Sequence, residues 1–293
     1  MTTITPDEMK SLETLFMSET GTPSILLMEH AAQGVAAAIS RHAPKSAHVL
    51  FLCGPGSNGG DGYAAARLWC LGGGQADVWE VTSAVRGDAL TNRTLALLHG
   101  VRVLPSVDAV DVAEYAAVVD ALYGTGLNHA IEGDAAILIH RLNDHPQIPV
   151  IAVDIPSGLD GTTGRALGAD VVRAAETVTF HRIKQGLLLR QGVEYTGKIT
   201  VQPILIRPGD DIDLGFDGLE TLSPAALAPL FARTPALHKG DCGRAVIFCG
   251  SRGHGCAAGR QSRIGGTLRV RRRYGEFRGS DAVYGESSSR RDS

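Results

Sequence analysis

The chain has 293 residues, and a hydrophobic content of 44% is enough for a large buried core. Its net charge of −3 gives no reason to expect a nucleic-acid partner, and the lack of an 18-residue apolar run gives no reason to expect a membrane. The five cysteines form no Cys-x-x-Cys pair and the first residues are polar, unlike a signal peptide. We therefore expect a soluble, cytoplasmic protein without disulfides or a zinc site.

Hydrophobic periodicity predicts alternating helices and strands over the first two thirds of the chain. In chain order they are a helix over 23–41, a strand over 47–53, a helix over 62–71, a strand over 77–81, a helix over 87–99, strands over 101–104 and 117–122, a helix over 135–143, and strands over 150–153, 177–180 and 198–201. Such alternation is typical of βαβ units. It predicts an α/β fold with a mainly parallel sheet covered on both faces.

Three glycine-rich loops, at 54–62, 124–126 and 156–158, each follow an apolar strand. The carboxyl ends of parallel strands meet at one edge of a sheet, and open α/β sheets bind ligands there. We expect the three loops to build one site.

The first of these loops contains the stretch Ser57-Asn58-Gly59-Gly60-Asp61-Gly62. Glycines let the backbone approach a ligand closely, and the start of the following helix offers unpaired N–H groups to an anion. Asn58 and Asp61 add polar side chains that can position a sugar or a metal. The loop therefore indicates nucleotide chemistry.

Two other interpretations of the loop remain open. Gly54 to Gly59 matches the Gly-x-Gly-x-x-Gly fingerprint, and Glu80 is a candidate for the acidic residue that a dinucleotide-binding oxidoreductase places after its second strand. Alternatively, the loop is a tight turn that only packs strand on helix. A P-loop is excluded because the chain has no Gly-Lys-Ser/Thr.

Polar side chains also follow three later strands. Asp120 and Asp154 end apolar strands, where a charge is costly unless it is paired or coordinated. Oxygen ligands from Asn58, Asp120 and Ser157 would suit a hard cation such as an alkali or alkaline-earth ion. His181 and Lys184 follow a further strand and are either catalytic or part of a solvated strand end.

Four motifs in the same order resemble the YjeF N-terminal domain family, the NAD(P)H-hydrate epimerases. They are the 57–62 stretch, Val119-Asp120-Ala121-Leu122-Tyr123-Gly124-Thr125-Gly126-Leu127, Val153-Asp154-Ile155-Pro156-Ser157-Gly158-Leu159 and Thr177-Val178-Thr179-Phe180, preceded by the similar helix Leu27-Met28-Glu29-His30-Ala31-Ala32. The resemblance covers about residues 5–215. It implies a Rossmann-like three-layer αβα sandwich over 1–215 that interconverts the R and S epimers of hydrated NADH and NADPH.

The resemblance also implies roles for particular residues. Contacts with the hydrated dinucleotide would come from Ser57, Asn58, Gly59, Gly60 and Asp61, from Gly124, Thr125, Gly126, Leu127, Asn128, His129 and Ala130, and from Asp154. Asn58, Asp120 and Ser157 would hold a potassium ion. We expect Asp154 to act as general acid and base, with Lys184 as a second catalytic candidate that polarises the hydroxyl. Ser57 stands where the family usually has Asn, and His129-Ala130 where Arg-Pro is common.

The remainder of the chain resembles the family's frequent fusion partner only briefly. We expect a linker over 216–237 and, over 238–258, a remnant of the start of an ADP-dependent, ribokinase-like dehydratase, whose activity would be absent. Residues 259–293 are rich in arginine without lysine and are expected to be disordered. A shifted reading frame in GC-rich DNA would produce such a tail; a basic arm for nucleic acid is the competing interpretation.

Two function classes compete with the epimerase. One is a non-catalytic binding module of the same fold, and the other is a dinucleotide-binding oxidoreductase. The presence of Asn58, Asp61, Asp120, Asp154 and Ser157 favours the enzyme. A homodimer is one option for the oligomeric state, which the sequence leaves open.

Overall fold

The computed structural model describes residues 2–207, 209, 218 and 219. The expected remnant over 238–258 and the expected tail over 259–293 lie outside the described residues. So does the expected linker over 216–237, apart from 218 and 219.

A seven-stranded sheet forms the centre of the fold, and every neighbouring pair of its strands is parallel. The strand order is β3-β2-β1-β4-β5-β6-β7. The strands span His48–Cys53 (β1), Gln75–Glu80 (β2), Arg102–Val103 (β3), Ala117–Ala121 (β4), Val150–Val153 (β5), Glu176–Phe180 (β6) and Lys198–Gln202 (β7). The predicted parallel α/β sheet is confirmed.

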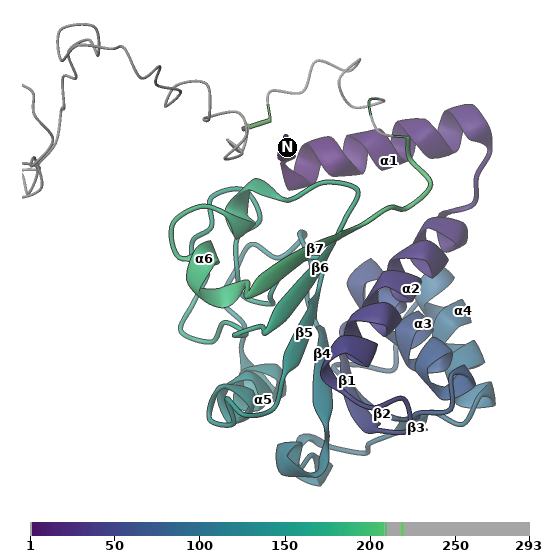
Figure 1. The fold of residues 1–293 in the computed structure, drawn as a ribbon, viewed down its shortest axis with the longest axis vertical. Helices are drawn as coiled ribbons and strands as arrows, with labels where there is room; N and C mark the ends of the chain where they lie inside the picture. The colour runs from purple at the N-terminus through teal and green to yellow at the C-terminus, as the bar shows by residue number, and fades with distance from the viewer. Residues whose placement is uncertain (1, 208, 210–217, 220–293) are drawn as a thin grey trace, which may run out of the picture. The chain divides into compact units, whose positions relative to one another are not determined.

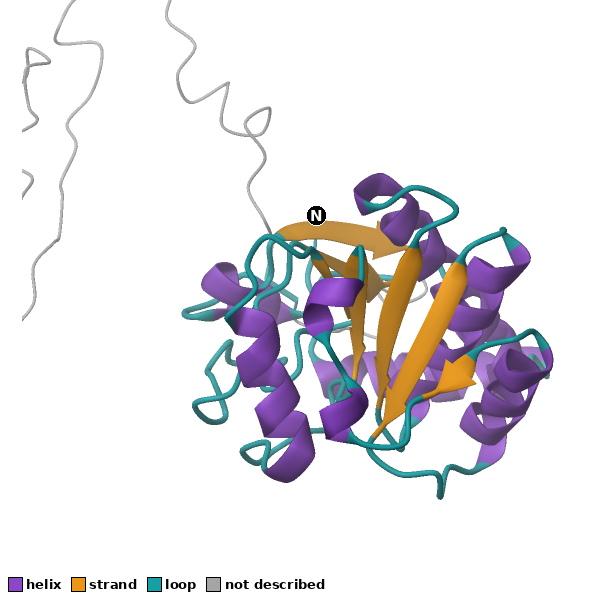
Figure 2. Ribbon diagram, turned by 90° about the horizontal axis from the view of Figure 1, so that it is seen from below, coloured by secondary structure: helices purple, strands orange, loops and turns teal. Residues whose placement is uncertain are grey.

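Helices cover the sheet on both faces, as Figures 1 and 2 show. They span Pro6–Thr20 (α1), Ser24–His42 (α2), Ser57–Leu71 (α3), Gly87–Leu98 (α4), Gly133–Asn143 (α5) and Gly192–Tyr195 (α6). One core cluster joins α2, α3 and α4 to one face of the sheet, and a second joins α5 to the other face. The predicted three-layer αβα arrangement is confirmed.

The start of α3 differs from the prediction. The helix begins at Ser57 and not at Gly62, so the glycine-rich stretch forms its first turns. A Cβ atom at Gly62 would lie 2.9 Å from Cys53 Sγ and 2.6 Å from Ala121 Cβ, and one at Gly60 would lie 2.7 Å from Met28 Cε. The glycines therefore let the helix pack directly against the sheet and α2, and this packing overrides their poor helix propensity.

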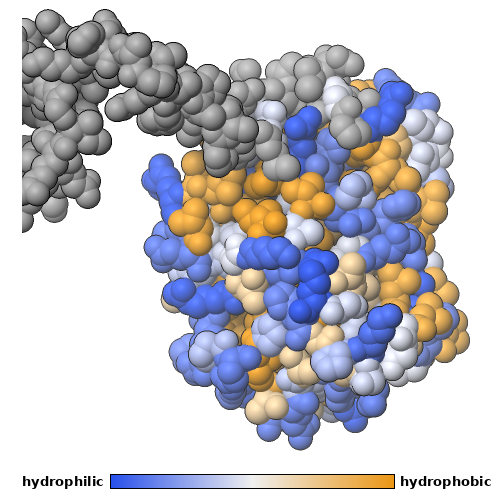
Figure 3. Space-filling view, viewed as in Figure 1, coloured by the Kyte–Doolittle hydropathy of each residue, from blue (hydrophilic) through white to orange (hydrophobic). Residues whose placement is uncertain are grey.

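Among the described residues, no helix combines the length and the apolar character that crossing a bilayer requires. On the face shown in Figure 3, hydrophilic and apolar side chains are interspersed.

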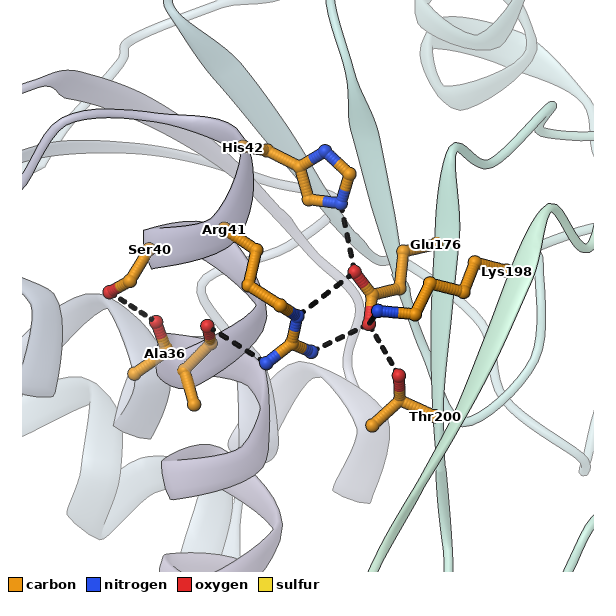
Figure 4. Close-up of polar contacts among 8 residues, drawn as sticks. Ala36, Ser40, Arg41, His42, Glu176, Lys198 and Thr200 are labelled. Carbon is orange, nitrogen blue, oxygen red and sulfur yellow. Dashed lines mark hydrogen bonds and ion pairs between the residues drawn. The ribbon is translucent and has the colours of Figure 1, made fainter.

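A fully buried glutamate, Glu176 at the start of β6, joins α2 to the sheet (Figure 4). Arg41 Nη2 lies 2.6 Å from Glu176 Oε1, and His42 Nε2 lies 2.8 Å from Oε2. Lys198 and the Thr200 hydroxyl contact Oε1 from β7. Burial raises the pKa of Glu176, but the hydrogen bonds from Arg41, Thr200 and His42 outweigh it and lower the pKa to about 2.

This cluster predicts a pH-dependent contribution to stability. Because the folded state lowers the pKa of Glu176, its contribution is complete above about pH 4.5 and disappears as the pH falls toward 2. Glu176→Gln is expected to reduce the free energy of unfolding at pH 7 by about 2–3 kcal/mol. Urea unfolding at several pH values measures the effect, with the exposed Glu194→Gln as control. A difference between wild type and Glu176→Gln that stays constant from pH 7 to pH 2 would contradict this role.

Candidate functional site

The candidate site lies at the carboxyl edge of the sheet, where the chain changes direction between β1 and β4. On one side of this point the strand order proceeds from β1 through β2 to β3. On the other side it proceeds from β4 through β5 and β6 to β7. Ligands of open α/β sheets bind at such a switch point. Gly54 N donates to Ala121 O (2.9 Å), so the segments that follow the two strands are in direct contact.

The start of α3 presents backbone donors at this edge. Its N-cap, Gly56, makes no side-chain capping bond, and Ser57 is exposed. The buried Asn58 Nδ2 has no hydrogen-bond partner among the described residues. Gly124 packs against Asn58, since a Cβ atom at Gly124 would lie 3.2 Å from Asn58 Oδ1. An unpaired buried amide beside open helix N–H groups is what a polar ligand satisfies.

Asp120 and Ser157 form a buried pair. The Ser157 hydroxyl donates to Asp120 Oδ1 (2.6 Å), and Ser157 N donates to Oδ2 (2.8 Å). Tyr123 N donates to Ser157 Oγ (2.9 Å) and adjoins Gly124, which connects the pair to Asn58. Asp120 and Ser157 are thus in direct contact, and Asn58 is connected to them only through the segment Tyr123-Gly124.

The donor atoms of this group are of the kind that hard cations prefer. Burial raises the pKa of Asp120 to about 6, although hydrogen bonds from Ser157 and Leu122 work in the opposite direction. No Lys, Arg or His in the described part of the chain forms an ion pair with Asp120. Its carboxylate, the Ser157 hydroxyl and the Asn58 amide offer only oxygen ligands to a metal. Within the same residues, no group of three or more His, Cys, Asp or Glu side chains could hold a metal ion.

Asp154 and Lys184 form the other half of the site. Lys184 Nζ lies 2.6 Å from Asp154 Oδ1, and only 1% of the Lys184 side chain is exposed. The Thr179 hydroxyl (3.0 Å) and Phe180 N (3.3 Å) donate to the same oxygen. Asp154 has a left-handed backbone with φ +63°, an uncommon conformation that concentrates at functional sites. Of the two candidates after β6, Lys184 and not His181 makes this contact.

Two more carboxyl groups lie near this ion pair. Asp61 is buried, and its pKa is raised well above the ordinary value by burial, then by the charges of Asp154 and Glu13. Burial also raises the pKa of Glu13 in α1, while the nearby Lys184 lowers it and Asp154 raises it. The charge of Lys184 lowers the pKa of both carboxyl groups, but less than burial raises it. The sequence pattern does not indicate Glu13, because it predicts no helix before residue 23.

The loop after β4 borders the site but contacts it only in part. Gly124 touches Asn58, whereas Gly126, Asn128 and His129 are exposed. Thr125, Leu127 and Ala130 are half-buried, and the His129 ring lies 3.1 Å from the Asn128 side chain. Contacts of this loop with a dinucleotide remain a prediction.

Glu80 does not have the free carboxylate that the oxidoreductase interpretation requires. Tyr63 Oη donates to Glu80 Oε2 (2.7 Å), and Arg93 binds both carboxylate oxygens at 2.7 and 2.8 Å. Burial raises the pKa of Glu80, but the hydrogen bonds from Arg93 and Tyr63 outweigh it and lower the pKa below its ordinary value. Through these hydrogen bonds the Glu80 carboxylate holds α3 and α4 against the sheet.

Comparison with known proteins identifies the family of this chain. Residues 24–186 match the family described as YjeF-related protein N-terminus. The chain belongs to this family. The match spans the start of α3, Asp120, Asp154 and Lys184, so the resemblance seen in the sequence is confirmed.

Named relatives cover the described domain. A protein called NAD(P)H-hydrate epimerase from Weissella koreensis is 35% identical over 69% of this chain and 90% of its own length. Another of that name, from Leuconostoc mesenteroides, is 34% identical over 76% of this chain and 98% of its own length. The bifunctional NAD(P)H-hydrate repair enzyme Nnr from Pyrobaculum aerophilum is 37% identical over 79% of this chain, which spans only 46% of that enzyme.

A solved structure shows the same fold. The crystal structure of the yeast protein ynu0 matches with a TM-score of 0.63 and 22% sequence identity, over 76% of this chain and 98% of the yeast chain. The Rossmann-like αβα fold of the YjeF family member is therefore confirmed by structure as well as by sequence.

Proposed function

We propose that the described domain is an NAD(P)H-hydrate epimerase, an isomerase that repairs hydrated NADH and NADPH. The observation that carries the proposal is the buried Asp154–Lys184 pair at the carboxyl edge of the sheet, the edge at which α3 also begins with uncapped amides. Relatives called NAD(P)H-hydrate epimerase, which this chain matches over 90% and 98% of their length, support it. The proposed substrate is thus a small molecule, and residues 1–215 are its proposed catalytic domain.

The reaction requires one acid–base group near the epimeric carbon. That carbon bears a hydroxyl and is bonded to the ring nitrogen. Once the hydroxyl is protonated, the nitrogen lone pair can expel it as water. Protonated Asp154 would supply that proton, and its carboxylate would then take a proton from the water that adds to the opposite face. Lys184, held 2.6 Å from Asp154, orients this carboxylate and stabilises its charge.

The remaining residues of the site would bind and orient the substrate. The backbone N–H groups from Ser57 to Gly59 suit a phosphate of the dinucleotide. Asn58 and Asp61 would contact polar groups of the substrate, and the loop from Gly124 to Ala130 would cover it. These contacts, like the assignments of Asp154 and Lys184, are part of the proposal.

Potassium is the proposed metal cofactor, held by Asn58, Asp120 and Ser157. The ion would compensate the charge of buried Asp120 and brace the ends of β4 and β5 against each other. The support is the oxygen-only donor set around a carboxylate that lies in a buried pair with Ser157.

Removing one proposed ligand is expected to weaken potassium binding. In Ser157→Ala, the KCl concentration for half-maximal activity should rise about tenfold, because one oxygen ligand worth about 1.4 kcal/mol is lost. The increase in Tm on adding KCl to the apo-protein should shrink in parallel, which measures binding without activity. Ser106→Ala, an exposed position, is the control. An unchanged KCl requirement in Ser157→Ala would contradict the assignment.

One coupled assay tests the function. Purified protein is added to the R epimer of hydrated NADH or NADPH together with a dehydratase that accepts only the S epimer. Faster clearance of the R form supports the epimerase, whereas an unchanged rate refutes it and leaves the non-catalytic binding module. A change in nicotinamide absorbance without the dehydratase would instead indicate the oxidoreductase, which the engaged Glu80 disfavours.

A further inference from the structure

The Asp154 carboxylate is held through one of its two oxygens. Lys184 Nζ (2.6 Å), the Thr179 hydroxyl (3.0 Å) and Phe180 N (3.3 Å) all contact Asp154 Oδ1. Among the described residues, none donates a hydrogen bond to Oδ2, and 13% of the Asp154 side chain remains exposed. Oδ1 is therefore surrounded by donors, and Oδ2 is the oxygen left for the proton transfer of the proposed reaction.

The backbone of Asp154 is attached to the same strand, β6. Asp154 N donates to Val178 O (2.8 Å), and a tight turn follows in which Ile155 N donates to Val153 O (2.7 Å). The left-handed φ of +63° at Asp154 is a conformation that persists only where the surrounding contacts determine it. Because its backbone and its Oδ1 are both bound to β6, the direction of Oδ2 is set by this strand.

Of the three donors to Oδ1, the Thr179 hydroxyl has the most restricted side chain. Thr179 is fully buried in β6, and a β-branched residue has few χ1 rotamers. Lys184 reaches Oδ1 with a flexible four-carbon side chain, and Phe180 donates from its backbone over a longer distance. Within the described ranges, the other acceptor near the Thr179 hydroxyl is the Arg182 carbonyl, at 3.5 Å. That distance is too long for a normal O–H···O bond, so the hydroxyl proton is directed to Asp154.

The loop that carries Lys184 is braced independently of Thr179. Ile4 forms two backbone hydrogen bonds, of 2.9 and 3.0 Å, with the residues on either side of Lys184. The N-terminal segment is anchored in turn, because Thr3 N and the Thr3 hydroxyl donate to Leu219 O at 2.9 and 3.1 Å. Loss of the Thr179 hydroxyl is therefore expected to leave Lys184 in place and to affect the carboxylate beside it.

We propose that Thr179 is a positioning residue that holds Asp154 Oδ1, so that Oδ2 gives a proton to the substrate hydroxyl and then takes one from the water that adds. The proton-transfer part of this inference rests on the proposed epimerase function. The hold of Thr179 on the carboxylate does not, because it is a contact of the folded domain.

Kinetics of the epimerase test the positioning role. Thr179→Val removes the hydroxyl at nearly constant side-chain size and is expected to lower kcat about tenfold, with KM within about twofold of wild type. Thr179→Ser keeps the hydroxyl and should restore kcat to within about threefold of wild type. Thr177→Val is the matched control, because Thr177 is also buried in β6 and its hydroxyl donates to Thr196 O (2.7 Å). A kcat of Thr179→Val equal to or above that of Thr177→Val would overturn the role.

A thermal double-mutant cycle at neutral pH tests the contact without using activity. The Thr179 hydroxyl donates to a carboxylate in wild type but to a neutral amide oxygen in Asp154→Asn, and hydrogen bonds to charged groups are stronger. Thr179→Val should therefore lower Tm by about 3 °C less in the Asp154→Asn background than in the wild type. Thr177→Val should lower Tm equally in both backgrounds. Equal losses for Thr179→Val would overturn the proposal.

Together the two measurements separate failure of this inference from failure of the proposed function. If wild type does not epimerise but the thermal coupling is present, the proposed function fails and the hold of Thr179 on Asp154 stands. If wild type epimerises and Thr179→Val behaves as Thr177→Val does, the epimerase stands and the positioning role fails.

Discussion

Asp154→Asn is expected to lower kcat for epimerisation by about 1000-fold, the largest effect of any single substitution in this domain that leaves the fold intact. General acid–base catalysis contributes about 100- to 10,000-fold to a rate, and the amide of Asn can neither release nor accept the proton. Asn fits the site without strain, since it tolerates the left-handed φ of +63° at this position better than Ala does. The coupled assay on the R epimer measures the change.

Two comparisons make this result specific to the carboxylate. Asp134→Asn, at an exposed position in the first turn of α5, removes the same charge outside the proposed site and should leave kcat unchanged. KM in Asp154→Asn should change less than kcat, because the side chain keeps its size. An Asp154→Asn enzyme within about tenfold of the wild-type kcat would exclude Asp154 as the acid–base group.

Gly54→Ala is expected to abolish activity and to destabilise the domain by about 3 kcal/mol or more. A Cβ atom at Gly54 would lie 1.6 Å from the carbonyl oxygen of Leu122, so the segments after β1 and β4 must separate. That separation breaks the hydrogen bond from Gly54 N to Ala121 O and moves Asn58 away from Gly124. Core overpacking of this kind costs about 1–3 kcal/mol even where only side chains move.

A glycine two residues along the chain provides the matched control. A Cβ atom at Gly56 meets nothing within 4 Å, and the φ of −97° suits any residue. Gly56→Ala should therefore fold with a Tm close to that of wild type. Urea unfolding and the coupled assay compare the two variants, and similar stability of Gly54→Ala and Gly56→Ala would show that the two segments need not be in contact.

The sheet could be predicted from the sequence because its strands are short apolar runs, several of them followed by glycine. The six-residue strand β1, for example, is buried from its second residue onward. Helix α1 could not be predicted, since only two of its residues, Met9 and Leu12, are buried and the pattern is too sparse to show a periodicity. The helical conformation of residues 57–62 is hidden for a different reason, because tertiary packing overrides the low helix propensity of the glycines in this stretch.

The candidate site was predictable where polar residues end apolar strands. Asp120 and Asp154 break otherwise apolar stretches, and such charges need partners that a sequence pattern can suggest. Glu13 follows no strand and belongs to no glycine-rich loop, so no local sequence feature indicates that it lies near the site. Its proximity to Lys184 depends on the pairing of Ile4 with Ile183 and Gln185, which lie far away along the chain.

The pairing of Thr3 with Leu219 has a consequence for the timing of folding during synthesis. Proteins emerge from the ribosome N-terminus first, so the first residues of this chain are made long before their hydrogen-bonding partners. Ile4 can pair beside Lys184 only after Gln185 has emerged, and Thr3 must wait for Leu219. The backbone pairing that fixes residues 3 and 4 beside Lys184 therefore forms only after β1 to β6 have been synthesised.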